Sequence, residues 1–442
     1  MSERVIATVL QKLFNERADE LAKQTGFIGR ERKLTGSKFV KTLLFGWLQN
    51  NTPSVEGLAR AGVSHDLHIS AQGIDQRFTS KAAEFLKSLL EEAMKQVVAA
   101  KLPVALERLN RFSAVYLSDC SVVCLPDELH EQWRGTGGSE NTSRAALKID
   151  TCLELRTGQL RCGLLQGEQH DSKSPLANAE YEPGCLRIQD LGYFNLERMK
   201  AQAERGEFWL SRYKVGTVVF DAQGERMDLL NVLITLKKSG VKQHEYNILL
   251  GAQSQIRARL VIGQLPQEAA GRYRARIKEN AKNKGKTASQ DSLALCDWML
   301  LVTNANAEQL PFADCFLFYG IRWQIELLFK LWKSHGKLGS SASQNPWRIL
   351  CELYAKLLAL IVQHWLVLTG GWHIPERSLV KAGQMIREQS IRLAACFNNF
   401  EALVVVLDDL AKRFEVGCRM NSRRKKPNSC QQLVQGCAFS LS

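Results

Sequence analysis

The chain has 442 residues, enough for two or three domains with hydrophobic cores of their own, which excludes a small scaffold held together by disulfides. Lys and Arg number 59 against 45 Asp and Glu, giving a formal net charge of +14. The twelve cysteines include no CxxC pair and no paired-histidine spacing. They are therefore expected to be buried reduced thiols rather than ligands of a zinc module.

Most of the excess positive charge lies in two stretches. Residues 272–286 contain seven Lys or Arg against one Glu, and residues 411–442 contain the same numbers. Clustered cationic charge is typical of proteins that contact nucleic acid. A solvated basic loop and a disordered tail have the same composition, so both interpretations stay open.

Residues 1–105 have helical periodicity and almost no strand pattern, which predicts an all-α front domain. Within it, residues 54–62 and 69–78 fit two short helices joined by a turn, as in a helix-turn-helix. On the second helix the exposed residues would be Gln72, Asp75, Gln76 and Arg77. We interpret this domain as a DNA-binding domain.

From about residue 106 the sequence pattern changes to short apolar runs separated by turns, and this pattern predicts strands. The runs are 114–118, 121–125, 146–155, 160–166, 185–189 and 207–214. A helical pattern at 195–206 lies among them, so residues 106–345 are expected to form an α/β domain.

Strand-like runs continue through residues 215–305, around the first basic stretch. They are 231–238, 257–265 and 298–304. We predict that this part of the α/β domain is a mainly β insertion.

Residues 346–442 are predicted to be helical, ending in the basic tail. The most apolar segment, 349–368, is interrupted by Glu352, Lys356, Gln363 and His364. These polar residues favour a core helix or a dimer helix over a membrane span. No signal peptide opens the sequence, so a cytoplasmic protein is expected.

The stretch "FYGIRWQIELLFKLWK", residues 318–333, predicts a largely buried helix with one polar stripe. At roughly 100° per residue, the four polar side chains of this stripe fall within a narrow sector. They are Tyr319, Arg322, Glu326 and Lys333. Pairing within the helix would explain them, and so would a cleft or a charged partner.

Two aspartates follow apolar strand patterns: Asp119 closes "AVYLSD" and Asp190 closes "CLRIQD". Functional side chains gather at strand ends in α/β sheets, although a single Asp there is also a common turn or cap residue. Asp119, Asp190 and Glu326 are 71 and 136 residues apart. Two aspartates on strands and a later glutamate on a helix are the layout that ribonuclease-H-like nucleases use to hold two divalent ions.

With these residues in register, the chain resembles the DD(E/D) transposases of insertion-sequence family four. Their signature is Y-x2-R-x3-E-x6-K, which Tyr319, Arg322, Glu326 and Lys333 match. The resemblance extends to "YLSDC", "DLGYF", "WLSRYK" and "DWMLLVTN", and so covers most of residues 110–340. It implies a ribonuclease-H-like core with a β-strand insertion, flanked by all-α N-terminal and C-terminal regions.

The resemblance also implies roles for single residues. Asp119, Asp190 and Glu326 would bind two Mg²⁺ ions, for which Mn²⁺ substitutes. The residues implied to contact DNA are Tyr319, Arg322, Lys333, Trp298, Trp323 and Arg212. Trp298 matches the position on which family members that excise through a hairpin stack an extruded base, and a tryptophan packed in the core is the alternative.

The implied activity is cut-and-paste DNA transposition. Such an enzyme binds the terminal inverted repeats, cleaves the transposon ends and joins the freed 3′-hydroxyls to target DNA, without a nucleotide cofactor. A homodimer is expected from the family and from the apolar segment 349–368. Two alternatives are a stand-alone metal-dependent nuclease on the same fold and a domesticated DNA-binding protein derived from a transposase.

Overall fold

The structure is a computed structural model that describes residues 3–30, 33–137, 143–283, 285–421 and 431–433. The contacts within the chain divide it into two units, and only the described residues of each unit are considered below. The first unit comprises Met1–Ala105, Asp119–Gln169 and Gln324–Arg423. The second comprises Leu106–Ser118, His170–Trp323 and Arg424–Ser442. The units interleave along the chain, and the domain boundaries expected from composition stay a prediction.

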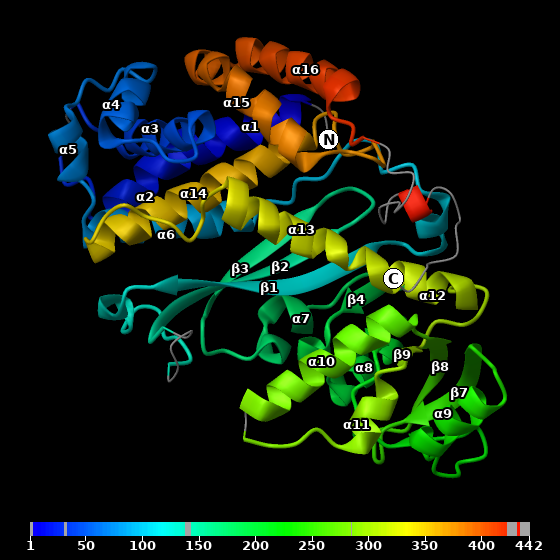
Figure 1. The fold of residues 1–442 in the computed structure, drawn as a ribbon. Helices are drawn as coiled ribbons and strands as arrows, with labels where there is room; N and C mark the ends of the chain where they lie inside the picture. The colour runs from blue at the N-terminus through cyan, green and yellow to red at the C-terminus, as the bar shows by residue number, and fades with distance from the viewer. Residues whose placement is uncertain (1–2, 31–32, 138–142, 284, 422–430, 434–442) are drawn as a thin grey trace. The chain divides into compact units, whose positions relative to one another are not determined.

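The first unit is mostly helical, and Figure 1 shows its N-terminal helices in blue. The N-terminal elements are α1 Glu3–Lys12, a π-helical turn Leu13–Arg17, α2 Ala18–Gln24, α3 Gly36–Gln49, α4 Val55–Val63, α5 Ala71–Asp75 and α6 Ser80–Met94. The later elements are α13 Trp323–Lys330, a π-helical turn Leu331–His335, α14 Pro346–Val367, α15 Leu379–Cys396 and α16 Phe400–Gly417. Residues 3–94 contain helices and no strand where the structure describes them, so the all-helical prediction for this stretch is confirmed.

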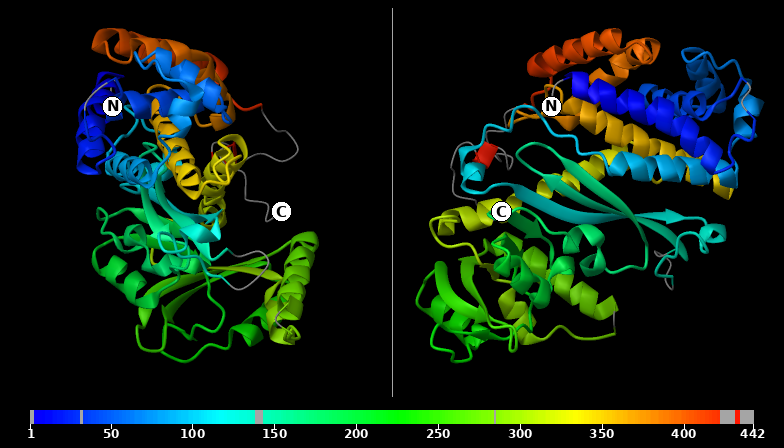
Figure 2. Two further views of the ribbon diagram at one scale, coloured as in Figure 1. Left: turned by 90° about the vertical axis from the view of Figure 1, so that its left-hand side faces the viewer. Right: turned by 180° about the vertical axis from the view of Figure 1, so that it is seen from behind.

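Helix α14 is the core helix of the first unit. It lies along α3 and α6, as the views in Figures 1 and 2 agree. Among the described residues it is the one helix long and apolar enough to cross a membrane, but 89% of its apolar window is buried inside the structure. The core interpretation of 349–368 therefore holds, and this helix has little surface to offer a second protomer.

The predicted helix-turn-helix is only partly present. Gln72, Asp75, Gln76 and Arg77 are exposed as expected. However, α5 has five residues, and the Asp75 carboxylate accepts a hydrogen bond from Arg348 Nη1 at 2.7 Å. A helix of little more than one turn is too short to lie in a major groove as a recognition helix does.

The second unit is built on a mixed sheet. Its strands are β1 Val115–Leu125, β4 Leu186–Gln189, β5 Phe208–Arg212, β6 Val219–Phe220, β7 Gln243–Leu250, β8 Ile256–Gln264 and β9 Trp298–Thr303. Their order is β1-β4-β5-β9-β8-β7-β6, with β1, β4 and β5 parallel and the others antiparallel to their neighbours. The later part of β1 belongs to the first unit, where the order is β3-β2-β1, with β2 Ala145–Glu154 and β3 Leu160–Gln166 antiparallel.

Helices of the second unit connect its strands. They are α7 Pro175–Asn178, α8 Leu196–Glu204, α9 Leu229–Lys238, α10 Gln267–Asn283, α11 Gln290–Leu295 and α12 Phe312–Ile321. Every residue of β4 and β9 is buried. The sequence of β9 accordingly reads as a continuous apolar run, whereas β4 alternates apolar residues with the buried polar residues Arg187 and Gln189. The predicted fold class, α/β with flanking helical regions, is confirmed.

Two sequence predictions in the insertion were wrong. Residues 231–238, expected as a strand, lie in helix α9, because Asp228 caps the helix by accepting from the backbone N–H groups of Leu230 and Asn231. The buried residues Leu229, Leu233 and Leu236 recur at helical spacing. Strand β7 was missed because its first half is exposed and polar.

The predicted basic stretches have different outcomes. Residues 267–283 form α10, with Lys284 outside the described residues. The basic tail at 423–426 also lies outside the described residues, so its expected role in DNA binding stays a prediction.

Candidate active site

The two aspartates of the predicted triad follow a paired position of neighbouring parallel strands. Ser118 of β1 pairs with Gln189 of β4, and the next residues are Asp119 and Asp190. Ile188 of β4 pairs with Leu210 of β5, two residues before Asp190 and Arg212 respectively. Neighbouring strands lie roughly 4.8 Å apart. The sheet register therefore places Asp190 level with Arg212 at the carboxyl ends of β4 and β5.

The Asp190 carboxylate is available for a ligand. Asp190 is half-buried and precedes the short helical turn Leu191–Tyr193, but its side chain makes no cap hydrogen bond to that turn. No other hydrogen bond or ion pair of this side chain is found among the described residues. A half-buried carboxylate without a cap bond retains its lone pairs for a cation, so the turn-cap interpretation of Asp190 is not supported.

Asp190, Arg322 and Arg212 all act electrostatically on Tyr319, and all four residues lie within the second unit. Tyr319 is 9% exposed on α12, and burial is the main cause that raises the pKa of its hydroxyl to about 12. Asp190 adds to the rise, while Arg322 and Arg212 oppose it. The Arg322 guanidinium carbon lies 5.9 Å from the centre of the Tyr319 ring. Four of the predicted site residues are therefore grouped near the end of β4.

The helix expected at 318–333 is interrupted. Helix α12 ends at Ile321, Arg322 is its C-cap in right-handed helical conformation, and α13 begins at Trp323. A π-helical turn then carries Lys333, which is exposed. A π turn winds more residues into one turn than an α-helix, so the simple 100° projection does not hold as far as Lys333.

The predicted burial of this helix was also partly wrong. Trp323 is 52% exposed and Leu327 is 38% exposed, so the face that carries them is not part of the core. The opposite residues Ile325, Leu328 and Phe329 are buried as expected. An exposed tryptophan beside Arg322 is compatible with the predicted DNA contact of Trp323, which stays a prediction.

The three predicted carboxylates are divided between the units. Asp119 and Glu326, both half-buried, belong to the first unit, and Asp190 belongs to the second. Within the part of the chain that the structure describes, no three His, Cys, Asp or Glu side chains are already grouped as a metal site. Convergence of the triad stays a prediction. As a donor set, three half-buried carboxylates suit a hard ion such as Mg²⁺, and the uncapped Asp190 side chain fits that use.

Trp298 is packed in the core, which was the alternative to its predicted role in stacking an extruded base. It is 4% exposed at the start of β9 and belongs to the hydrophobic cluster of the insertion, with Leu260 and Leu300. It also lines a cavity of about 170 Å³ together with Arg212 and Tyr273. The Arg212 guanidinium carbon lies 5.3 Å from the centre of the Tyr273 ring. Base stacking on Trp298 stays a prediction and would have to occur through this small cavity.

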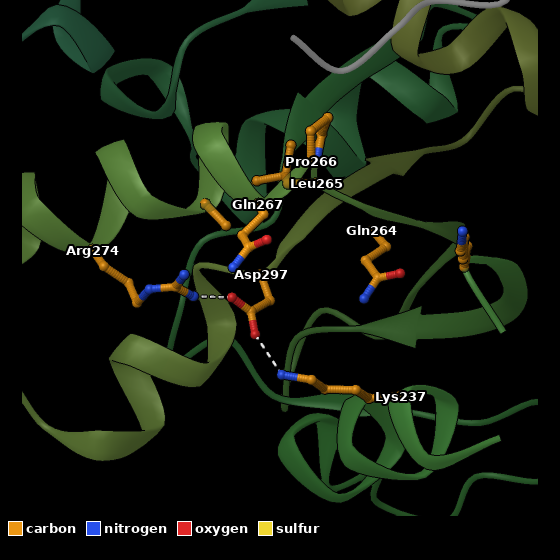
Figure 3. Close-up of a pocket in the computed structure, with 9 residues that line it drawn as sticks. Lys237, Gln264, Leu265, Pro266, Gln267, Arg274 and Asp297 are labelled. Carbon is orange, nitrogen blue, oxygen red and sulfur yellow. Dashed lines mark hydrogen bonds and ion pairs between the residues drawn. The ribbon is translucent and has the colours of Figure 1, made fainter. Parts of the chain in front are cut away.

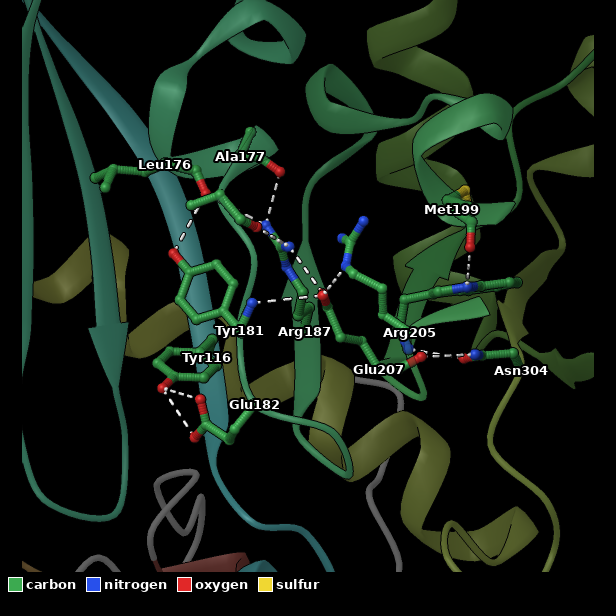
Figure 4. A network of polar contacts seen from close by, with 12 residues as sticks. Tyr116, Leu176, Ala177, Tyr181, Glu182, Arg187, Met199, Arg205, Glu207 and Asn304 are labelled. Atoms are coloured by element: carbon green, nitrogen blue, oxygen red, sulfur yellow. Dashed lines mark hydrogen bonds and ion pairs between the residues drawn. The ribbon is translucent and has the colours of Figure 1, made fainter. Parts of the chain in front are cut away.

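A buried ion pair holds the strand that leads to Asp190. Arg187 of β4 and Glu207 are 1% and 0% exposed, with 3.1 Å between Arg187 Nη1 and Glu207 Oε2. Arg187 also donates to the backbone carbonyls of Leu176, Ala177 and Ala179, as Figure 4 shows in part. The network ties the segment before β4 to β4 itself, three residues from Asp190.

Sequence reasoning missed Asp171. It lies in the short helical turn Asp171–Lys173, and a Cβ added to Gly192 would meet its Oδ2 atom at 3.1 Å. Gly192 stands in the turn directly after Asp190, so this close approach brings another carboxylate beside the candidate site. The sequence signal was weak, because Asp171 follows no strand pattern and only the fold brings it to Gly192.

Asp190 at the end of the parallel strand β4, with Tyr319 and Arg322 contributed by a later helix of the same unit, is an arrangement typical of nucleases built on an α/β sheet. Residues 110–362, more than half of the chain, match the family model of the transposase DDE domain. The chain belongs to the DDE transposase family.

Individual relatives agree with this assignment. The chain is 29% identical over 368 residues to the transposase for insertion sequence element IS231C of Bacillus thuringiensis subsp. berliner, covering 78% of this chain and 75% of the relative. It is 25% identical over 377 residues to the transposase for IS1151 of Clostridium perfringens, covering 80% of this chain and 78% of the relative. A putative transposase InsL for IS186A of Escherichia coli (strain K12) matches over 188 residues at 29% identity, covering 40% of this chain and 46% of the relative.

Proposed function

We propose that this transposase works by cut-and-paste, cleaving the ends of its insertion sequence and joining the freed 3′-hydroxyls to target DNA. The observation that carries the proposal is the grouping of Asp190 with Tyr319, Arg322 and Arg212 at the ends of β4 and β5. A buried, protonated phenol with a carboxylate and two guanidinium groups in its electrostatic surroundings suits a phosphodiester held beside a cation. The match of Tyr319, Arg322, Glu326 and Lys333 to the Y-R-E-K signature supports insertion-sequence family four.

Asp119, Asp190 and Glu326 would hold two Mg²⁺ ions, with Mn²⁺ as a substitute. When bound, such ions supply Lewis acidity to the attacking and leaving oxygens of a phosphodiester. Arg322 presents a planar fork to phosphate oxygens, and Lys333 adds an exposed point charge. The Tyr319 hydroxyl would donate a hydrogen bond to a phosphate oxygen, because its raised pKa keeps the hydroxyl protonated at neutral pH.

The remaining assignments follow from the family. We propose that residues 1–105 bind the terminal inverted repeats, that a homodimer holds two ends, and that the protein acts in the cytoplasm. Because α14 is buried, residues that follow this helix in the chain would form the contacts between the protomers. Excision through a hairpin would use Trp298, as argued from its position in "DWMLLVTN".

The test is to incubate the purified protein and Mg²⁺ with DNA carrying the ends of its own element, and to sequence the products. Asp190→Asn removes a charge with little change in shape, so cleavage should collapse while end binding persists in a gel-shift assay. Asp291→Asn is the matched control, since Asp291 is an exposed residue of the same unit.

Different products separate the alternatives. Cleavage without strand transfer would indicate a stand-alone nuclease, and binding without cleavage would indicate a domesticated DNA-binding protein. If Asp190→Asn cleaved at nearly the wild-type rate, Asp190 would not be a metal ligand and the proposed site would have to be abandoned.

A further inference from the structure

A cationic hollow lies in the β insertion, and none of the candidate active-site residues belongs to its lining. Its volume is about 630 Å³, and its charged lining residues are Lys237, Lys242, Arg274 and Asp297. Figure 3 shows that these side chains come from different elements, with Lys237 on α9, Arg274 on α10 and Asp297 directly before β9. Two amide side chains, those of Gln264 and Gln267, complete the polar lining. The fold therefore collects three cations and one carboxylate in the lining of one hollow.

Asp297 orients two of these cations. It accepts from Lys237 Nζ at 2.8 Å and from Arg274 Nη1, the two dashed contacts in Figure 3. Burial by itself would raise the pKa of Asp297, but Lys237 and Arg274 outweigh it and hold that pKa below its ordinary value. Asp297 is therefore ionised at neutral pH. One carboxylate uses few of the eight N–H donors of the two cations, so most of them remain for a ligand.

Helix α10 extends the cationic surface beyond the hollow. Lys278 and Lys282 follow Arg274 at intervals of four residues, so they lie within about 80° of it around the helix axis. Both lysines are exposed, and neither has a hydrogen bond or ion pair among the residues that the structure describes. Tyr273 and Ile277 lie on another side of the helix and line the cavity beside Trp298.

The resulting row consists of Lys237, Lys242, Arg274, Lys278 and Lys282, and we call it the insertion ridge. From Arg274 to Lys282 it runs roughly 12 Å along α10, at 1.5 Å per residue. Duplex DNA rises about 3.4 Å per nucleotide along each strand, so this part of the ridge spans between three and four steps. Arg274 shares Asp297 with Lys237, whereas Lys278 and Lys282 have no described partner. A row of cations at that spacing suits a polyanion better than a single small anion.

We propose that the insertion ridge binds the phosphate backbone of duplex DNA outside the cleavage site. The inference rests on the proposed transposase function and adds a binding surface to it. The ridge carries five cations against Asp297 and presents flexible lysines, which neutralise phosphates without reading bases. Its contribution to binding is therefore independent of sequence and sensitive to salt.

The test measures the affinity for a DNA end fragment over a series of salt concentrations. The double variant Lys278→Gln/Lys282→Gln should lower the slope of log K against log salt by about two, because each phosphate contact contributes about 0.9. Binding should weaken by a similar factor on the end fragment and on unrelated duplex DNA of equal length. The matched control is Lys200→Gln, an exposed helical lysine of the same unit without a described partner, which should leave the slope unchanged.

Two results would overturn the proposal. One is a double variant whose salt slope equals that of wild type and of Lys200→Gln. The other is competition by millimolar inorganic phosphate that removes the difference between variant and wild type at constant ionic strength, which would indicate a site for a free anion. Cleavage of the same DNA by the wild-type protein with Mg²⁺ is measured in parallel. This measurement tests the proposed transposase function separately from the ridge.

Discussion

Burial keeps the Tyr319 hydroxyl of the candidate site in its neutral form. Its ring is buried on α12, and its pKa of about 12 lies above the ordinary value of 10.0, with burial as the main cause. The neutral phenol is therefore favoured over the phenolate through the whole range in which activity would be measured. A donor that never titrates suits a site that must hold a phosphate at any working pH.

Tyr319→Phe keeps the ring and removes the donor. If the hydroxyl contacts a DNA phosphate, cleavage should slow by about 10- to 100-fold, since a hydrogen bond to a charged group is worth about 1.5–3 kcal/mol. The melting temperature should hardly change. The wild-type rate should show no loss between pH 8 and 10 from this residue, since its pKa lies above that window. A Tyr319→Phe variant that cleaves at the wild-type rate would remove the tyrosine from the site.

Trp298 needs a milder substitution than alanine, because it is a core residue. Trp298→Ala should lower the free energy of unfolding by about 3–5 kcal/mol, as large-to-small core substitutions do. Nicking and hairpin formation would then fail together for a structural reason. Denaturant unfolding of the variant measures this effect directly.

Trp298→Phe separates stacking from packing. Phenylalanine fills most of the volume, so first-strand nicking should persist while hairpin formation slows by roughly tenfold, within the 1–3 kcal/mol of base stacking. An abasic nucleotide at the extruded position should partly restore the second step, because unstacking then costs less. Equal slowing of both steps would assign Trp298 to the core alone.

At the scale of elements, the Arg187–Glu207 pair fixes strand β4 and the segment before it. Arg187→Met should destabilise the protein by about 3–5 kcal/mol, because it leaves Glu207 buried with one partner fewer. The control is Arg205→Met, which removes the other partner of Glu207, a side chain 31% exposed, and should cost less. Thermal and denaturant unfolding of both variants would decide.

A second substitution tests whether the pair itself or its buried charge matters. Replacing Glu207 by Gln in the Arg187→Met background should recover part of the lost stability, because it removes a buried charge that only Arg205 still pairs. Equal losses for Arg187→Met and Arg205→Met would contradict the central place of Arg187 in this network.

At the scale of the whole molecule, two buried histidines make stability depend on pH. His65 and His364, both in the first unit, are 2% and 4% exposed. Burial is the main cause that lowers both pKa values from 6.5 to about 4. His364 donates from Nε2 to the Gly158 carbonyl at 2.7 Å, whereas neither ring nitrogen of His65 has a partner among the described residues.

Acid should therefore destabilise the first unit. A depressed histidine pKa means that the unfolded chain binds more protons between pH 6.5 and 4, so stability is fully present above pH 6.5 and is lost as the pH falls toward 4. The loss is at most about 3 kcal/mol per histidine. His65→Phe should flatten roughly half of this decline, measured by melting temperature from pH 7 to pH 4.5. A decline unchanged by His65→Phe would contradict the assignment.

Several local features followed from the sequence by itself. Helical periodicity in residues 3–94 predicted helices and the short runs at β1, β4 and β9 predicted strands, because the period of apolar residues follows the backbone geometry. The resemblance carried by Asp119, Asp190, Glu326 and the motifs around them indicated a DDE transposase, and the family match confirms that class. These signals are local or depend on residue identity, so no coordinates were needed.

The tertiary structure decided what depends on distant neighbours. Residues 231–238 became helix α9 through the Asp228 cap and packing on the insertion core, although their apolar content suggested a strand. Trp298 is buried because β8 and β9 pair and their shared face is covered, a fact that no window of sequence contains. Asp171 reaches Gly192, and Lys237 reaches Asp297, only when segments some 20 to 60 residues apart are folded together. The composition of the chain gives its charge and its apolar content. Long-range packing decides which of the charged residues lie on the same surface.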